Sequence, residues 1–296
     1  RSLTTNYTNL NLRQLGDQEF NIVDSVSNFT KYAVQVNNPL EIKYHLERAY
    51  HEATSGRPGP VWVDVPLDVS TEDVDVGSLN GFLSEPDSKM IIDYKKIADR
   101  LMNSEKPLLI SGNGVRLSKS VELLNDIIEE YKIPVITSLN GIDSISNEYE
   151  YYGGRFGTIG NKSANKLVQE ADFVLSLGSR LYVRQIGYNF KSFAKNAYKI
   201  YVDIDKNELD KPTIFPDVKV NMDVNEFLIN LKPHLKPLSI DNWRNRCVDY
   251  VKNYPNVLDR HRVAESPLST YGVIDKLSDY MSEDIKIKEK PKNVYK

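Results

Sequence analysis

The sequence has a single cysteine, no large excess of positive or negative charge, and no long apolar run. Each of these features excludes a class of structure or partner. Cysteine occurs once in 296 residues, as Cys247, so the chain forms no internal disulfide and fits a reducing cytoplasm. The formal net charge of -3 gives no basic field of the kind that attracts nucleic acid or anionic membrane surfaces. No apolar run approaches the roughly 20 residues of a membrane-spanning helix. We therefore expect neither nucleic acid nor a membrane as a partner.

Apolar residues are plentiful, and their arrangement divides the chain. Hydrophobic residues make up 40% of the sequence, and the length suggests about two domains. Within residues 1–66, a helix is predicted over 38–53 and a strand over 61–65, where valines alternate with other residues. Residues 67–93 are acidic and rich in turns, which is typical of a linker.

From residue 94 to about 235 the pattern changes to repeated strand and helix. A helix over 118–131 carries its apolar residues on one face. Strands alternating with helices predict an α/β fold, a doubly wound parallel sheet covered on both sides. Two more helices are predicted within 236–296, over 241–253 and 269–282. The predicted strands of the sheet are 107–111, 134–138, 172–177, 199–203 and 218–221.

Glycine-rich turns stand at two places in this pattern. Gly112 and Gly114 stand where a strand should pass into a helix, so the backbone could approach a phosphate closely. The third glycine of a dinucleotide fingerprint would fall at Leu117, so a tight turn without a ligand is an equal alternative. Gly157 and Gly160 lead into another predicted helix and again offer amides at its start.

Two arginines and an acidic strand end are expected at the same edge of the predicted sheet, where its parallel strands end. Gly178 is followed by Arg180 and Arg184, and a guanidinium group donates two parallel hydrogen bonds to a phosphate. Asp203 and Asp205 end a strand, where a carboxylate can accept from ribose hydroxyls. For these aspartates alone, capping of the next helix is the more common role. Together, the turns, arginines and acids predict a nucleotide site.

Several segments also carry a family resemblance. Residues 56–66, Gly-Arg-Pro-Gly-Pro-Val-Trp-Val-Asp-Val-Pro, closely resemble the end of the first domain of thiamine diphosphate (ThDP) enzymes of the acetolactate synthase type. Residues 157–165, 178–184 and 201–205 resemble, in order and spacing, segments of the central domain of that family. Residues 16–19 add an earlier match. The chain is accordingly identified as a member of this family.

The resemblance implies a domain plan with partial domains on both flanks. Residues 1–66 would be the C-terminal part of the pyrimidine-binding domain, and 94–235 the central, nucleotide-binding-like domain. Residues 236–296 would be a linker and the truncated start of the diphosphate-binding domain. Because 56–66 normally follows a long first domain and only 55 residues precede it here, we expect a fragment of a larger enzyme.

The resemblance also implies a reaction. The complete enzyme would use ThDP and Mg²⁺ to decarboxylate a 2-oxo acid such as pyruvate and join the product to a second carbonyl compound, as a homodimer or homotetramer. The catalytic glutamate of the family is expected to precede Arg1, and its Mg²⁺-binding Gly-Asp-Gly motif is expected beyond the chain, so no metal site is predicted. Gln18 matches a glutamine near the active site of related enzymes, with a turn-stabilising amide as an equal alternative.

Central domains of this family bind FAD, ADP or nothing, and the resemblance makes Arg180, Arg184 and Asp203 the nucleotide contacts. Flavin-binding members carry acidic residues between the two arginines, where this chain has Tyr182 and Val183. They also carry an arginine where this chain has Ser27. An empty or ADP-binding site is thus at least as well supported as a flavin site. A different class of function is a stand-alone nucleotide-binding or regulatory module without catalysis.

Overall fold

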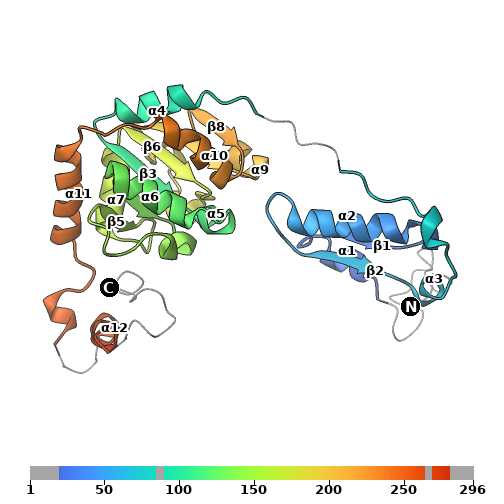
Figure 1. Ribbon diagram of the computed structural model, residues 1–296. Coiled ribbons are helices and arrows are strands. Elements are labelled where there is room, and N and C mark those ends of the chain that lie inside the picture. Colours follow the sequence, from blue (N-terminus) through green and yellow to red (C-terminus); the bar gives the residue numbers. More distant parts are fainter. Residues whose placement is uncertain (1–19, 85–89, 264–268, 281–296) are drawn as a thin grey trace. The chain divides into compact units, whose positions relative to one another are not determined.

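The computed structural model describes residues 20–84, 90–263 and 269–280 (Figure 1). The chain divides into two compact units, Arg1–Lys89 and Met90–Lys296. In the part of the chain that the structure describes, no helix is both long and apolar enough to cross a membrane.

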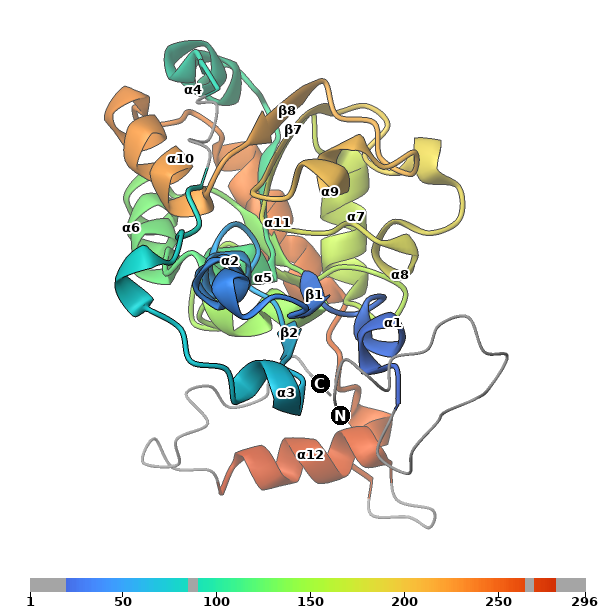
Figure 2. The ribbon, with the colours of Figure 1, turned by 90° about the vertical axis from the view of Figure 1, so that its right-hand side faces the viewer.

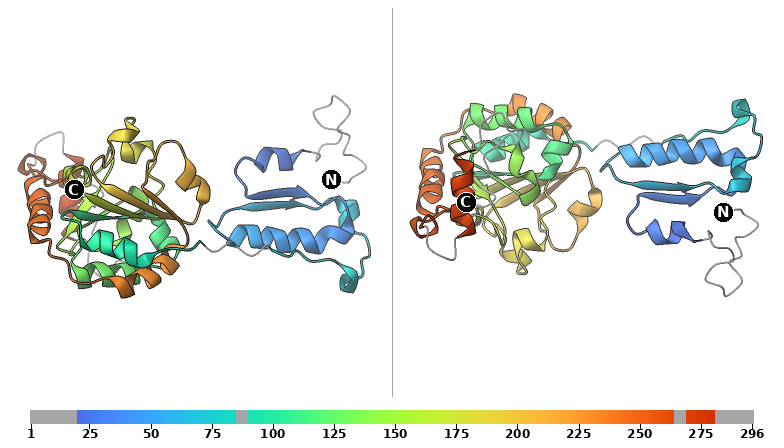
Figure 3. Two further views of the ribbon diagram at one scale, coloured as in Figure 1. Left: turned by 90° about the horizontal axis from the view of Figure 1, so that it is seen from above. Right: turned by 90° about the horizontal axis from the view of Figure 1, so that it is seen from below.

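The first unit is built around two parallel strands, β1 (Tyr32–Gln35) and β2 (Val61–Asp64). Both strands contact α1 (Ile22–Val26) and α2 (Ile42–Thr54), which lie on opposite sides of them in Figure 3. The Asn38 side chain accepts a hydrogen bond from the Leu40 amide and starts the helical segment, as the sequence predicts. The short helix α3 (Leu67–Ser70) begins the acidic segment.

The second unit contains a six-stranded sheet in which every pairing is parallel. Its strands are β3 (Pro107–Ser111), β4 (Val135–Thr137), β5 (Tyr152–Arg155), β6 (Phe173–Leu177), β7 (Tyr198–Asp203) and β8 (Val218–Asn221). Its helices are α4 (Tyr94–Met102), α5 (Asn113–Leu117), α6 (Val121–Tyr131), α7 (Lys162–Glu170), α8 (Val183–Ile186), α9 (Lys206–Asp210), α10 (Val224–Leu231), α11 (Asp241–Asn253) and α12 (Thr270–Ser278).

The strand order β5-β4-β3-β6-β7-β8 shows how the sheet is wound. The chain runs outward from β3 through β4 to β5, then returns to the other side of β3 and continues through β6, β7 and β8. Helices α4, α6 and α10 pack together on one face, and α7 and α11 on the other (Figure 2). This arrangement confirms the predicted doubly wound parallel α/β fold. Its switch point, where ligands bind in such folds, lies between β3 and β6.

Strand β5 was missed by the prediction, which places no strand between residues 138 and 172. A Cβ on Gly153 would lie 2.3 Å from the Leu167 side chain, and Gly154 has φ +94°. Helix α7 therefore packs directly on the backbone of β5. Glycine here permits close packing of a strand, which a pattern based on side chains does not reveal.

Helix α11 begins and ends where the sequence predicts, and it packs against α7 and β5 of the central sheet. The buried Trp243 donates from its indole nitrogen to the Pro107 carbonyl at 2.9 Å. Arg244 donates to the carbonyls of Tyr131 and Lys132 at 2.9 and 2.8 Å. The packed unit thus continues beyond residue 235, where the sequence pattern places the end of the central domain.

Candidate nucleotide-binding site

The turns after β3 and β6 meet backbone to backbone at the switch point. The Gly112 amide donates to the Leu177 carbonyl and the Gly114 amide to the Gly178 carbonyl, each at 2.9 Å. A Cβ on Gly112 would lie 2.1 Å from the Gly178 oxygen, and one on Gly114 would lie 2.6 Å from the Gly178 Cα. Gly178 has φ +56°. These three glycines are therefore needed for the close contact of the two turns.

The remaining glycine amides of the predicted site also have internal acceptors. The Gly178 amide donates to the Val202 carbonyl at 2.8 Å. The Gly157 amide donates to the Asn165 side chain, and the Gly160 amide to the Gly157 carbonyl, both at 2.9 Å. All five glycine amides of the predicted phosphate site thus donate hydrogen bonds to acceptors within the protein. The predicted use of these amides as phosphate donors is therefore not supported by their hydrogen bonding.

The loop after β5 reaches the helix after β6. Gly157 has φ +118°, and a Cβ there would lie 2.8 Å from the Arg184 carbonyl oxygen. The next residue, Thr158, donates to the same oxygen from its amide at 2.8 Å and its hydroxyl at 3.2 Å. The structure therefore brings the turn at Gly157 and Gly160 together with α8, which carries the exposed Arg184 side chain.

Arg180 is held by an acidic partner that the sequence reading did not single out. Its Nε lies 2.5 Å from Glu208 Oε1, and Lys211 donates to the other carboxylate oxygen at 2.8 Å. Lys211 also donates to the Arg180 carbonyl. Burial opposes ionisation of Glu208, but hydrogen bonds and charges from Lys211 and Arg180 outweigh it and lower the pKa of this carboxyl. Glu208 is therefore a carboxylate that competes with any phosphate for Arg180.

The two aspartates at the end of β7 order the start of α9. Asp203 accepts from the Asp205 amide at 3.0 Å, and Asp205 accepts from the Asn207 amide at 2.9 Å. Asp205 is the N-cap of α9, so the capping interpretation holds for it. A sequence signal for Glu208 was available, because an acid three residues after an N-cap lies in the first helical turn.

Two further polar groups of this region were missed. Ser179 Oγ and Arg155 Nε are buried, and neither has a hydrogen-bond partner within the described residues. Ser179 directly follows Gly178 at the switch point, and Arg155 ends β5, at the same carboxyl edge of the sheet. An unpaired buried donor is costly, so such groups mark places where a ligand or water can complete the bonding.

Gln18 lies outside the described residues. Within those residues, no group of three or more histidine, cysteine, aspartate or glutamate side chains is arranged to hold a metal ion.

Comparison with known proteins adds the family. Residues 94–231, which include the whole six-stranded sheet, match the model of the thiamine pyrophosphate enzyme central domain. This segment is therefore similar in sequence to the central domain of thiamine pyrophosphate enzymes. The resemblance seen in the sequence is thereby confirmed.

Relatives of the family extend the similarity over most of the chain. The acetolactate synthase large subunit of Lactococcus lactis is 32% identical over 239 residues, covering 79% of this chain and 40% of the relative. The acetolactate synthase large subunit of Pyropia yezoensis is 31% identical over 282 residues, which cover 90% of this chain and 48% of the relative. A probable acetolactate synthase large subunit of Methanocaldococcus jannaschii is 29% identical, covering 93% and 48%. The chain spans less than half the length of each of these relatives.

Proposed function

We propose that this chain is part of a ThDP-dependent enzyme that acts on 2-oxo acids, an acetolactate synthase-like transferase or decarboxylase. The support is the central-domain match at 94–231 together with relatives named acetolactate synthase. ThDP, when bound, supplies the carbon nucleophile that attacks the 2-oxo acid. In this proposal the complete enzyme binds ThDP and Mg²⁺.

The role we assign to the described residues is binding of a nucleotide, ADP or FAD, at the switch point. The observation that carries this proposal is the contact of the turns at Gly112 and Gly178 between β3 and β6, where doubly wound sheets bind nucleotides. The unpartnered hydroxyl of Ser179 lies in the same turn.

The proposal assigns a role to each predicted site residue at the carboxyl edge of the sheet. Arg180 and Arg184 donate to phosphate oxygens, since both guanidinium groups are exposed and planar forks suit phosphate. Asp203 accepts from a ribose hydroxyl, as acids at this strand position do in related architectures. The glycines act indirectly, by bringing the two turns together.

Assembly and location belong to the same proposal. We place the complete enzyme in the cytoplasm as a homodimer or homotetramer. The single cysteine supports the location, because Cys247 is buried and unpaired.

Melting temperature with added ligand tests the nucleotide proposal on the 296-residue chain itself. A ligand that binds only the folded state raises the melting temperature by mass action, so millimolar ADP should raise it measurably, and at least as much as FAD. Arg180→Gln should remove most of the rise. Arg246→Gln is the matched control, because Arg246 is similarly exposed, at 56% against 60%, and also faces a glutamate. Equal responses of the two variants would refute the assignment of Arg180.

A further inference from the structure

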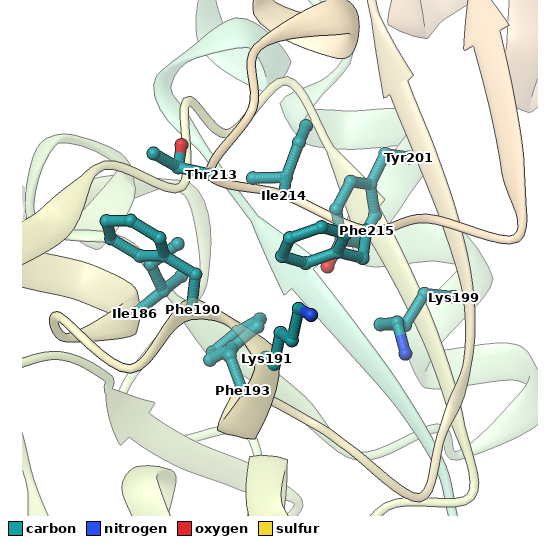
Figure 4. A pocket seen from close by; sticks show the side chains of 9 residues that line it. All are labelled: Ile186, Phe190, Lys191, Phe193, Lys199, Tyr201, Thr213, Ile214 and Phe215. Atoms are coloured by element: carbon teal, nitrogen blue, oxygen red, sulfur yellow. The ribbon is translucent and has the colours of Figure 1, made fainter.

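A separate pocket of about 260 Å³ lies along β7 (Figure 4). Its walls come from the connection between β6 and β7 and from the segment that precedes β8. Four aromatic rings line it, those of Phe190, Phe193, Tyr201 and Phe215. The volume equals that of about nine water molecules, so it suits one small molecule.

The pocket exists because the connection from β6 to β7 contains little helix. Between residues 178 and 197 the chain forms only the four-residue α8 and the short turn Phe190–Ser192. No long helix covers Lys199 and Tyr201 on this face of β7. Phe215, on the opposite wall, remains 45% exposed.

A tyrosine hydroxyl is directed into this pocket. Tyr201 is only 4% exposed, and it lines the pocket. Figure 4 shows its oxygen pointing into the space that the rings enclose. Burial, with a smaller effect from the Asp217 charge, raises the pKa of Tyr201. The hydroxyl is therefore protonated at neutral pH and can donate a hydrogen bond.

The charges around the pocket favour an anion. Lys191 is exposed, and Figure 4 shows its amine end turned into the same space. Lys199 donates to the Ala197 carbonyl at 3.1 Å and adds a second positive charge on the wall. The opposing carboxylate nearby is Asp217, which accepts from the Lys199 amide at 2.7 Å. The residues that line the pocket include these two lysines and no carboxylate.

We propose that this pocket binds a small aromatic carboxylic acid. The ring of the ligand packs among Phe190, Phe193 and Phe215, and its carboxylate accepts from the Tyr201 hydroxyl and the Lys191 amine. An apolar cavity with a few converging polar groups is the usual form of a small-molecule site. Aromatic walls favour an aromatic occupant through offset and edge-to-face contacts. The site is distinct from the switch point, which lies at the carboxyl ends of the strands.

Titration of the full chain with phenylacetate, followed by calorimetry and ligand-observed NMR, tests the proposal. A ligand of about ten non-hydrogen atoms is expected to bind with a Kd on the order of a millimolar. Tyr201→Phe keeps the ring and removes the hydroxyl, and it should weaken binding about tenfold. Lys191→Gln should weaken it by a similar factor. Lys195→Gln is the matched control, because Lys195 is an exposed lysine on the same connection that does not line the pocket.

Two results would overturn the proposal. One is the absence of saturable binding by a folded chain at phenylacetate concentrations of about ten times the expected Kd. The other is equal binding of the uncharged phenylacetamide with no effect of Tyr201→Phe, since recognition of a carboxylate would then be wrong. The melting temperature of each variant establishes that it is folded. Arg180→Gln should leave phenylacetate binding unchanged, which separates this site from the nucleotide proposal.

Discussion

The Arg180 guanidinium is paired with the Glu208 carboxylate, with Nε 2.5 Å from Oε1. Arg180 is the guanidinium that we assign to phosphate, and its side chain is 60% exposed, whereas the Glu208 side chain is only 11% exposed. Glu208 also holds Lys211, so the carboxylate stays fixed while Arg180 is free to exchange partners. In the nucleotide proposal, a phosphate therefore competes with Glu208 for this guanidinium.

Glu208→Gln should tighten ADP binding. The substitution removes the competitor for Arg180 and a negative charge near the phosphates, and an ion pair of this exposure is worth up to about 1 kcal/mol, or about two- to fivefold in Kd. Calorimetric titration with ADP measures the change. Asp210→Asn, on the same helix and paired with Lys206 and Lys219, should leave the Kd unaltered. Weaker ADP binding by Glu208→Gln would show that Arg180 does not exchange between the two partners.

Gly112→Ala should destabilise the chain strongly. The new Cβ would lie 2.1 Å from the Gly178 oxygen, and backbone on both sides must shift, so we expect a loss of more than about 3 kcal/mol in the free energy of unfolding. Gly187→Ala is the comparison, because Gly187 has φ +78° but open space around it, and backbone strain alone should cost about 1 to 3 kcal/mol. Denaturant unfolding measures both. A smaller loss of unfolding free energy for Gly112→Ala than for Gly187→Ala would contradict the close contact of the two turns.

Limited proteolysis should leave a core that runs from about residue 94 to about 253. Trp243 and Arg244 attach α11 to the sheet, so the bonds at 236–253 should resist cleavage as long as the sheet is folded. Mass spectrometry of the fragments locates the ends. Trp243→Ala removes the buried indole and should expose the segment to cleavage, with a loss of about 3 to 5 kcal/mol. A stable core ending at 235 in the unmodified chain would contradict the packing of α11.

Cys247 should be unreactive in the folded chain. Burial raises the pKa of its thiol to about 12, so at pH 8 only about one molecule in ten thousand carries the thiolate that reacts with alkylating or disulfide reagents. Because the folded state favours the neutral thiol, its contribution to stability is complete below the ordinary pKa of 9.0 and declines as the pH rises towards 12. Thiol titration with and without denaturant measures this. Rapid labelling of the native chain at pH 8 would show that the thiol is accessible.

The 296-residue chain should not release carbon dioxide from pyruvate in the presence of ThDP and Mg²⁺. The described residues offer no cluster of ligands for the metal, and the chain covers 40% to 48% of the relatives compared. A coupled assay measures the release against a control with cofactors alone. Release above that control that survives repurification would mean that the catalytic groups are present in this chain.

The sequence predicts the main sheet well because its strands are apolar runs between polar turns. Strand β3 and strand β8 lie at the predicted residues, and β6 differs by one residue. Strand β5 was not predictable in this way, since Gly153 and Gly154 carry no side-chain pattern. Gly153 is required by the approach of α7, and Gly154 by its positive φ and the nearby Asn161 side chain. Periodicity reports on side chains, whereas this strand is determined by backbone packing between distant segments.

For the candidate site, the sequence indicates which edge of the sheet is involved but not how its groups are bonded. The residues at Gly112, Gly178 and Asp203 do follow parallel strands and share one edge. The internal acceptors of the glycine amides, and the pairing of Arg180 with Glu208 across 28 positions, arise only when distant segments pack together. Tertiary contacts of this kind leave no local signal in the sequence.

Hydrogen exchange of the full chain with and without ADP tests the location of the nucleotide site most directly. Binding at the switch point should slow exchange of the amides in residues 112–118 and 178–186, while α11 and the first unit keep their rates. Each amide reports its own segment, so the measurement separates this edge from every other surface of the chain. Protection confined to other segments, or no protection at saturating ADP, would contradict the proposal that the contact of Gly112 with Gly178 forms a nucleotide site.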